Sequence, residues 1–356
     1  MKATLEGNLM SVSTATVSSV ARARTIVRLN TAYFQSKALQ SAVELGVFDL
    51  LAEGPATVDE IREKLGIRHR LAKDFLDVLV GLTLLDREED TYRNSETATE
   101  FLVAGQPTHL GGTARQHARL HYHAWAQLTE ALREGRATSA VASHGPLAYC
   151  KHYEDLERAR QVMTHMDAHN GFTADELARH IDWSMYSSFV DVGGARGNVA
   201  ARLVQAHRHL LGGVFDLPAL AALHAELMEK LGTTGQVNFH GGNFFTDPLP
   251  SADVLILGHV LSDWPVAARL TLVQRAFEAL GPGGALVIYD AMITEGTPDL
   301  HVLLQRINHT MICDDTSAYS VAECRDYVEK AGFRFERSVA ADTITDDHFV
   351  IAVKPR

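Results

Sequence analysis

The sequence predicts an α/β protein in which a mostly parallel sheet, with helices on both faces, follows a helical domain. From residue 188 onward, β-branched runs such as SFVDVGG, GGVFDLP, ADVLILGH and GALVIYDAM alternate with helical stretches, which is typical of such a sheet. Before residue 180, apolar residues recur at spacings of three and four, as in LQSAVELGVFDLL, the period of an amphipathic helix. We therefore expect a tail over residues 1–20, a helical domain over 21–180 and the α/β domain over 181–356.

The bulk properties exclude several classes of protein. A chain of 356 residues is long enough for two domains, each with its own core. The formal charge of −11 argues against nucleic acid as a partner, because phosphate binding needs a concentrated basic face. Cys150, Cys313 and Cys324 lack CxxC spacing, so neither a disulfide framework nor a thiolate metal site is expected. No apolar run approaches the length of a membrane span and no signal peptide is evident, which predicts a cytoplasmic protein with no membrane partner.

Residues 57–95 have the layout of a winged helix. Thr57 can cap a short helix, a second helix follows a glycine-containing turn, and a small hairpin begins near Leu84. The segment holds at least as much acid as base, so we interpret it as a structural or dimer-forming unit and not as a DNA reader. The stretch LNTAYFQSKALQSAVELGVF is an apolar helix that needs another surface to cover it, which predicts a homodimer through this domain.

The stretch FVDVGGARGNVAARLV is a strand, a glycine turn and a helix. Gly193, Gly194 and Gly197 let backbone N–H groups approach a ligand, and the helix that follows adds its positive end. Asp191 stands at the strand end directly before the glycines, where a carboxylate could engage an ammonium group. Asp216 ends the next strand, 25 residues later, where an acid would take a ribose diol. This order of acid, turn and acid fits both NAD and S-adenosylmethionine (SAM).

Five motifs in order carry a resemblance to a known family. VDVGGARG, FDLP, GGNFFTDPLP, HVLSDWP and EALGPGGALVIYDAMI together resemble the SAM-dependent small-molecule O-methyltransferases, which carry a winged-helix dimerisation domain in front. The resemblance implies a class I methyltransferase fold with a seven-stranded sheet, and SAM as methyl donor. Ala195 departs from the family's usual GGG turn. The residues expected to bind SAM are Asp191, Gly193, Gly194, Gly197, Asp216, Leu217, Asn243, Phe244 and Gly258.

The segment GHVLSDWP departs from the family at its central residue. In the O-methyltransferases that it resembles, the matching motif is HDW, and that histidine is the general base that deprotonates a phenol. Here the position holds Ser262, whose hydroxyl is too weak a base for that proton. The protein therefore either methylates an oxygen or nitrogen with another base, or runs another reaction on the same scaffold.

The second explanation leads to a metal site. His259 and Asp263 are four residues apart and share one face of a helical turn, and His309 lies in an apolar helix further along. Two histidines and an aspartate suit Zn²⁺ or Fe as a facial triad. The arrangement resembles the metal-dependent α-keto acid C-methyltransferases of peptide-antibiotic biosynthesis, and that resemblance implies catalytic metal ligands at His259, Asp263 and His309.

The expected reaction on this hypothesis is methylation of the β-carbon of a metal-chelated 2-oxo acid through its enolate. The alternative is an O-methyltransferase that acts on a phenolic small molecule without metal, with His259 as the first suspected base. On a purely structural interpretation, His259 could hydrogen-bond a backbone carbonyl and Asp263 could cap the helix that begins at Trp264–Pro265. His117, His121 and His123 recur at helical spacing and could line the pocket.

Overall fold

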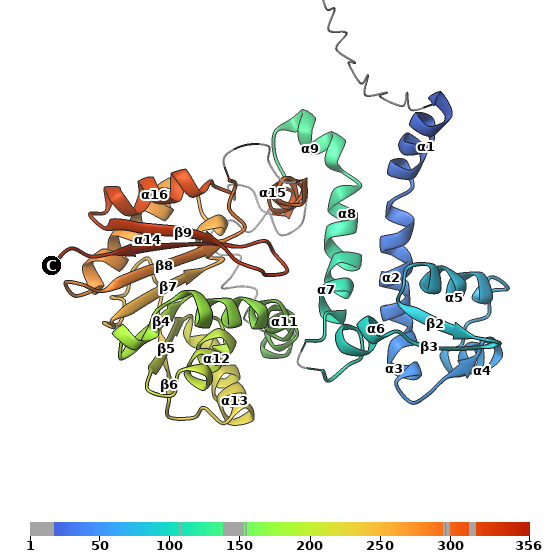
Figure 1. Ribbon diagram of the computed structural model, residues 1–356, viewed down its shortest axis with the longest axis horizontal. Coiled ribbons are helices and arrows are strands. Elements are labelled where there is room, and N and C mark those ends of the chain that lie inside the picture. Colours follow the sequence, from blue (N-terminus) through green and yellow to red (C-terminus); the bar gives the residue numbers. More distant parts are fainter. Residues whose placement is uncertain are drawn as a thin grey trace, which may run out of the picture.

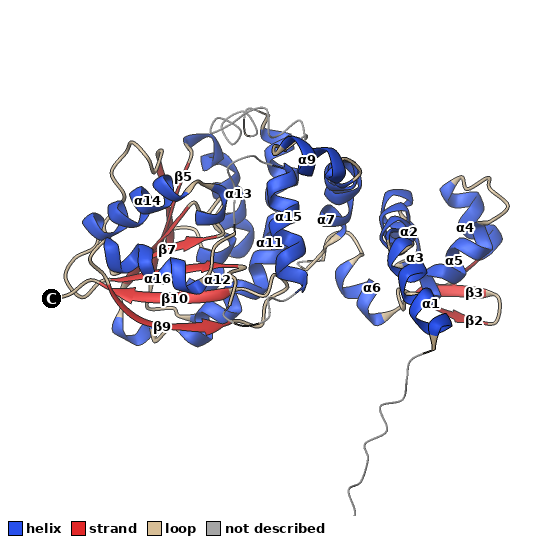
Figure 2. Ribbon diagram, turned by 90° about the horizontal axis from the view of Figure 1, so that it is seen from above, coloured by secondary structure: helices blue, strands red, loops and turns tan. Residues whose placement is uncertain are grey.

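The computed structural model describes residues 18–106, 108–137, 153, 155–294, 296, 300–312 and 318–356. Most of the expected tail, as well as Cys150 and Cys313, lies outside the described residues. A helical half and a sheet-containing half lie side by side (Figures 1 and 2).

The helical half begins with two helices in tandem and contains a small sheet. Thr57 caps its helix as expected: the Glu60 N–H donates to Thr57 Oγ1 over 3.4 Å, and the Glu60 carboxylate accepts from the Thr57 N–H over 2.7 Å. The winged-helix segment adds a three-stranded sheet of order β1-β3-β2, so the domain is not purely helical. Its elements are α1 (Ser19–Asn30), α2 (Tyr33–Leu45), α3 (Val47–Leu51), β1 (Ala56–Thr57), α4 (Val58–Leu65), α5 (Ala72–Gly81), β2 (Leu85–Glu88), β3 (Thr91–Asn94) and α6 (Glu96–Phe101).

A second group of helices joins the two halves. A π-helical turn, η1, interrupts the run from α7 to α8, and the long helix α11 leads into the sheet. The bounds are α7 (Gly111–Gln116), η1 (His117–His121), α8 (Tyr122–Trp125), α9 (Leu128–Glu134) and α11 (Leu156–His180).

The predicted seven-stranded sheet is confirmed, with strand order β6-β5-β4-β7-β8-β10-β9. β4 to β8 pair in parallel, whereas β10 is antiparallel to both β8 and β9. The strands are β4 (Ser188–Val192), β5 (Leu211–Asp216), β6 (Val237–Gly241), β7 (Val254–Gly258), β8 (Ala285–Asp290), β9 (Arg334–Ala340) and β10 (His348–Val353).

Helices cover both faces of this sheet. One apolar cluster joins the sheet to α11, α12 and α13, and a second joins the opposite face to α14 and α16 (Figure 1). The burial of both faces explains why the parallel strands read as continuous apolar runs. The remaining elements are η3 (Trp183–Met185), α12 (Asn198–Ala206), η4 (Pro218–Leu220), α13 (Ala221–Leu231), η5 (Leu261–Asp263), α14 (Val266–Ala279), α15 (Leu300–Ile312) and α16 (Val321–Lys330). Among the helices of the described ranges, none combines the length and apolarity needed to cross a membrane.

Candidate active site

A cavity of about 300 Å³ opens at the carboxyl ends of the central parallel strands, the usual ligand-binding edge of such sheets. The ends of β4, β5 and β7 form its floor, and α11 and η5 contribute its walls. All the residues predicted to bind SAM line it except Gly197, which is the N-cap of α12 with φ of 91°. We refer to it below as the SAM cavity.

Gly193 and Gly194, which follow β4, leave no room for side chains at their positions. A Cβ on Gly193, whose φ is +78°, would lie 2.7 Å from Val260 Cγ2, and one on Gly194 would lie 2.6 Å from Asp191 Oδ2. Ala195 adopts φ of 52° and donates its N–H to Asp216 Oδ2 over 2.8 Å. The alanine therefore accepts a left-handed backbone and still fits the turn. With no side chains at the two glycines, the backbone N–H groups of the turn can come close to a bound cofactor.

Two carboxylates face each other across this turn. Asp191 is 2% exposed, and its burial, together with repulsion from Asp216, raises its pKa to about 7. Burial also raises the pKa of Asp216 to about 6, against the opposing effect of hydrogen bonds from the Leu217 and Ala195 N–H groups. Both groups are costly to ionise at these buried positions, and a cationic ligand would reverse that cost. This chemistry fits the ammonium and sulfonium groups of SAM and its ribose diol.

Aromatic side chains close one side of the cavity. The ring centroid of Phe244 lies 4.8 Å from that of Phe245 and 5.9 Å from that of Trp264, both in edge-to-face geometry. All three residues line the cavity. They form an apolar wall suited to the flat face of an adenine ring.

His259 is held by two carboxylates and does not match its predicted role. It follows β7 with φ of 52°; its Nδ1 lies 3.4 Å from Asp290 Oδ1 and its Nε2 lies 3.3 Å from Asp347 Oδ2. Burial by itself lowers the pKa of His259, but the two carboxylates outweigh it and raise that pKa well above 6.5. The ring is therefore an imidazolium with no lone pair for a metal or for a substrate proton.

The other two predicted ligands do not join His259 at a metal site. Asp263 lines the SAM cavity from η5, whereas His309 lies in the last turn of α15 and is not among the lining residues. Within the described parts of the chain, no three His, Cys, Asp or Glu side chains are grouped so as to hold a metal ion. The sequence spacing of His259 and Asp263 could not show that both nitrogens of His259 are taken by carboxylates from β8 and from the residue before β10.

Ser262 occupies the position of the family's histidine and is buried in η5. Its backbone N–H donates to Asp290 Oδ2 over 3.2 Å, and its side chain is 3% exposed. The Oγ atom has no hydrogen-bond partner among the described residues.

The structure reveals two cavity histidines that the motif analysis did not select. His165 and His169 lie on α11 and line the SAM cavity, and the hydroxyl of Thr113 on α7 lies within hydrogen-bond distance of both. His165 and His169 are four residues apart, beside Met166, which places the two histidines on one face of a helix. Nothing in the sequence linked that face to Thr113.

A second cavity of about 660 Å³ lies between α2, η1, α8 and α15. His117 and His121 line it together with Tyr122 and Trp125, whereas His123 is exposed. His121 Nδ1 lies 2.8 Å from Asn308 Oδ1, which also accepts from the Trp125 indole N–H over 3.0 Å. Burial, followed by the neighbouring imidazoles of His121 and His169, lowers the pKa of His117 to about 4, so that ring is neutral.

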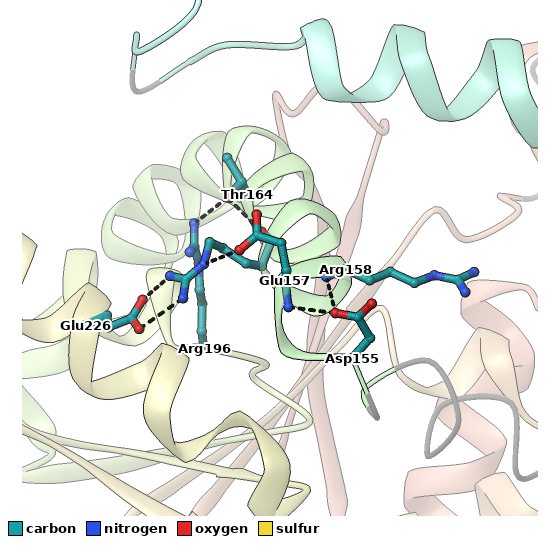
Figure 3. A network of polar contacts seen from close by, with 7 residues as sticks. Asp155, Glu157, Arg158, Thr164, Arg196 and Glu226 are labelled. Atoms are coloured by element: carbon teal, nitrogen blue, oxygen red, sulfur yellow. Dashed lines mark hydrogen bonds and ion pairs between the residues drawn. The ribbon is translucent and has the colours of Figure 1, made fainter.

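Polar contacts fix α11 against the sheet-containing half. Asp155 caps the helix by accepting from the Glu157 and Arg158 N–H groups (Figure 3). Arg160 pairs with Glu226 of α13 through both terminal nitrogens. Further along α11, Arg196 of the glycine turn donates to Thr164 over 3.2 Å (Figure 3) and to Asp167 over 2.8 Å. These contacts position the helix face that carries His165 and His169.

The chain matches two family descriptions over most of its length. They are an O-methyltransferase dimerisation domain over residues 27–104 and an O-methyltransferase domain over residues 125–334. N,N-dimethyltransferase OxyT of Streptomyces rimosus is 56% identical over 344 residues, which cover 97% of this chain and 100% of that protein. The tetracenomycin polyketide synthesis 8-O-methyl transferase TcmO of Streptomyces glaucescens is 45% identical over 333 residues, covering 93% of this chain and 96% of that protein. A crystal structure of human N-acetylserotonin methyltransferase in complex with SAM matches with a TM-score of 0.84 at 25% identity, covering 96% of this chain and 99% of that chain.

These comparisons correct the predicted reaction. The relatives are named for nitrogen and oxygen methylation, so the expected C-methylation of a 2-oxo acid is wrong, and so is the resemblance to the α-keto acid C-methyltransferases. The zinc or iron site is wrong as well, because His259 is held by Asp290 and Asp347 and the three predicted ligands do not form a metal-binding group in the described structure. SAM as cofactor and the alternative of heteroatom methylation agree with the comparisons. The chain is a SAM-dependent methyltransferase and belongs to the O-methyltransferase family.

Proposed function

We propose that this enzyme transfers the methyl group of SAM to a nitrogen or a hydroxyl oxygen of a polycyclic aromatic polyketide. The observation that carries the proposal is the 56% identity, over essentially both full chains, to an enzyme named as an N,N-dimethyltransferase. The 45% identity to a polyketide 8-O-methyl transferase supports the same class of acceptor. The cavity lined by Tyr122 and Trp125 offers aromatic surface to a flat ring system.

The residues of the SAM cavity define the roles that we propose for them. Asp191 would hold a cationic group of the cofactor and Asp216 its ribose, while the turn at Gly193 and Gly194 brings backbone against it. Phe244 would border the adenine. When bound, SAM supplies a sulfonium-activated methyl group that an acceptor heteroatom can attack in line. Holding the acceptor heteroatom in line with the methyl group supplies much of the orientation that such an attack requires.

We also propose that the enzyme is a homodimer through its N-terminal helices. No residue of α1 is buried in the single chain. Its large apolar side chains Ile26, Val27 and Leu29 are 67%, 63% and 69% exposed. Tyr33 and Phe34 continue this apolar surface at the start of α2 and are 52% and 57% exposed. An exposed run of large apolar side chains on two successive helices is typical of a subunit interface, and the region matches a dimerisation domain.

A labelled methyl donor tests the proposed reaction. The enzyme is incubated with SAM carrying a trideuterated methyl group and with two matched tetracyclic acceptors, one bearing an amine and the other a hydroxyl at the same carbon. Mass spectrometry and NMR then locate the label. We expect it on nitrogen or oxygen of at least one acceptor. Label on carbon, or no transfer to either acceptor by an enzyme shown to bind SAM, would overturn the proposal.

A further inference from the structure

We propose that His165 and His169, joined through the hydroxyl of Thr113, form the catalytic base that removes the acceptor's proton in place of Ser262. This inference rests on the proposed function, since only a heteroatom acceptor presents such a proton. The two histidines come from α11 and the threonine from α7, so the unit bridges the helical half and the sheet-containing half. Both imidazoles line the SAM cavity.

The contacts around Thr113 determine which ring nitrogens carry hydrogen. Thr113 Oγ1 lies 2.6 Å from His165 Nδ1 and 2.8 Å from His169 Nε2. A hydroxyl has a single hydrogen, so it can donate to only one of these nitrogens and must accept an N–H from the other. The two rings also touch each other edge to face, with centroids 4.8 Å apart.

Both imidazoles are neutral in this environment. Burial, followed by the neighbouring rings of His169, His117 and His121, lowers the pKa of His165 to about 3. Burial, then the positive charge of His259, lowers the pKa of His169 to about 4, against a smaller opposing effect of the Asp347 carboxylate. His117 and His121 act on the pair from η1, His259 from the end of β7 and Asp347 from the residue before β10.

Neutrality and the shared hydroxyl together give both rings the same tautomer, because one ring contacts the hydroxyl through Nδ1 and the other through Nε2. When Thr113 donates to His169 Nε2, the hydrogen of His165 is on Nδ1 and its Nε2 has a free lone pair. When Thr113 donates to His165 Nδ1 instead, the free lone pair is on His169 Nδ1. In either state one outer nitrogen is a base and the other is an N–H donor. The pair therefore always offers one proton acceptor.

The proton balance closes within the unit. As the acceptor heteroatom forms its bond to the methyl group, its proton passes to His165 Nε2. The hydrogen on His165 Nδ1 can then move to Thr113 Oγ1, and the threonine's own hydrogen to His169 Nε2, which leaves the charge on His169. Methyl transfer removes the sulfonium charge from the cavity, so an imidazolium replaces one positive charge with another. The Asp347 carboxylate favours that charge on His169, although the larger effect of the His259 charge opposes it.

Three other ionisable groups of the cavity, His259, Asp191 and Asp216, are less suited to this task. His259 is already an imidazolium between Asp290 and Asp347. Asp191 and Asp216 face the glycine turn and are assigned to the cofactor. Gly112, next to Thr113, permits the close approach of α7, since a Cβ there would lie 3.1 Å from His165 Cβ.

Five variants test the pair: His165→Gln, His169→Gln, the double histidine variant, Thr113→Val and the control Thr113→Ser, which keeps the hydroxyl. SAM affinity by calorimetry and melting temperature show that each variant is folded. With a phenolic acceptor we expect kcat to fall by about 10² or more in each histidine variant, the usual contribution of a general base. We expect a smaller loss for Thr113→Val and near-normal kcat for Thr113→Ser. The kcat of the double histidine variant should be only slightly lower than that of the less active single variant, because the two histidines act as one unit.

The pH profile separates a base from a structural role. In the histidine variants kcat should rise about tenfold per pH unit toward the pKa of the phenol, because the acceptor must then ionise by itself. The wild-type profile should be flatter. Histidine variants with wild-type kcat at neutral pH, or with a reduced kcat that does not change with pH, would overturn the proposal.

Nitrogen NMR of the histidine-labelled enzyme tests the geometry without any acceptor. We expect His165 and His169 to be neutral at pH 7, both with the hydrogen on Nδ1 or both with it on Nε2, and we expect this match to be lost in Thr113→Val. Charged rings, or different tautomers at the two sites, would refute the pair even in an active enzyme. Absence of transfer by the wild type, with these NMR signatures present, would refute the proposed function instead.

Discussion

His259 Nε2 lies 3.3 Å from Asp347 Oδ2, in an ion pair that joins the end of β7 to the residue before β10. Asp347 is fully buried and also accepts from the hydroxyls of Thr345, over 3.0 Å, and of Thr173 on α11, over 3.2 Å. With Asp290 on the other ring nitrogen, the histidine connects the edge of the sheet to the helix that carries the proposed base. We therefore assign it a structural role, in place of the catalytic role that the motif suggested.

Loss of this imidazolium should destabilise the fold. We expect His259→Gln to lower the free energy of unfolding at pH 7 by about 3 kcal/mol, because two buried carboxylates then lose their charged partner. The pKa of His259 is raised, so its contribution is complete below pH 6.5 and is lost as pH rises through the raised value. Burial raises the pKa of Asp347, but His259 outweighs this effect and lowers that pKa. The contribution of Asp347 to stability is therefore lost as pH falls below 3.8.

Urea unfolding at pH 5, 7 and 9.5 measures the difference in stability between His259→Gln and the wild type. Equal stability of variant and wild type at pH 7 would contradict the structural role.

Removal of metal should leave methyl transfer unchanged. Both ring nitrogens of His259 are engaged by carboxylates, so the residue has no lone pair for an ion. We expect enzyme treated with EDTA and with 1,10-phenanthroline to keep its initial rate. His309→Ala should show the same metal content by elemental analysis as the wild type. A rate that falls on chelation and returns with added zinc would show that this interpretation is wrong.

SAM affinity should depend on pH through Asp191. Its pKa is about 7 in the free protein, so the carboxyl gains a proton below that pH and loses its attraction for a cation. We expect the dissociation constant to rise as pH falls from 8 to 5.5, and SAM binding at pH 7 to release protons, measurable by calorimetry in buffers of different ionisation enthalpy. Asp191→Asn should bind weakly and without proton release. Glu229→Gln, on the exposed face of α13, is the control. Affinity that does not change with pH would contradict the assignment.

Gly258 should tolerate no side chain. A Cβ there would lie 1.9 Å from Tyr289 Cζ, and both residues belong to paired central strands, so neither can move away cheaply. We expect Gly258→Ala to lose several kcal/mol of stability by overpacking, or to fail to fold. Gly281→Ala is the matched control, because a Cβ at that position meets nothing within 4 Å. Thermal unfolding compares the two, and similar melting temperatures would argue against the tight packing at β7.

Charge on α1 should weaken the proposed dimer. Ile26 and Leu29 are exposed in the single chain and do not contribute to its core. The double variant Ile26→Lys with Leu29→Lys should therefore sediment as a monomer at concentrations where the wild type sediments as a dimer. A matched control replaces the exposed Arg24 with lysine. Sedimentation velocity measures the masses. A monomeric wild type would contradict the dimer outright.

The order of the elements and the SAM site could be predicted from the sequence because they rest on local signals. Alternation of β-branched runs with helices specified the parallel sheet, and the glycines after β4 marked a backbone turn that side chains would block. The acids at the ends of β4 and β5 could be placed together because the carboxyl ends of parallel neighbours meet at one edge of a sheet.

The chemistry next to that site could not be predicted in the same way. By itself the sequence determined that His259 leaves a strand end and that Ser262 stands where a base was expected. Only the tertiary structure decided that Asp290 and Asp347 enclose His259, and that Thr113 lies between His165 and His169. The physical reason is separation along the chain: 52 residues divide Thr113 from His165 and 88 divide His259 from Asp347. Whether an imidazole is a ligand, a base or a buried cation depends on such distant partners, because they set its charge and occupy its lone pairs.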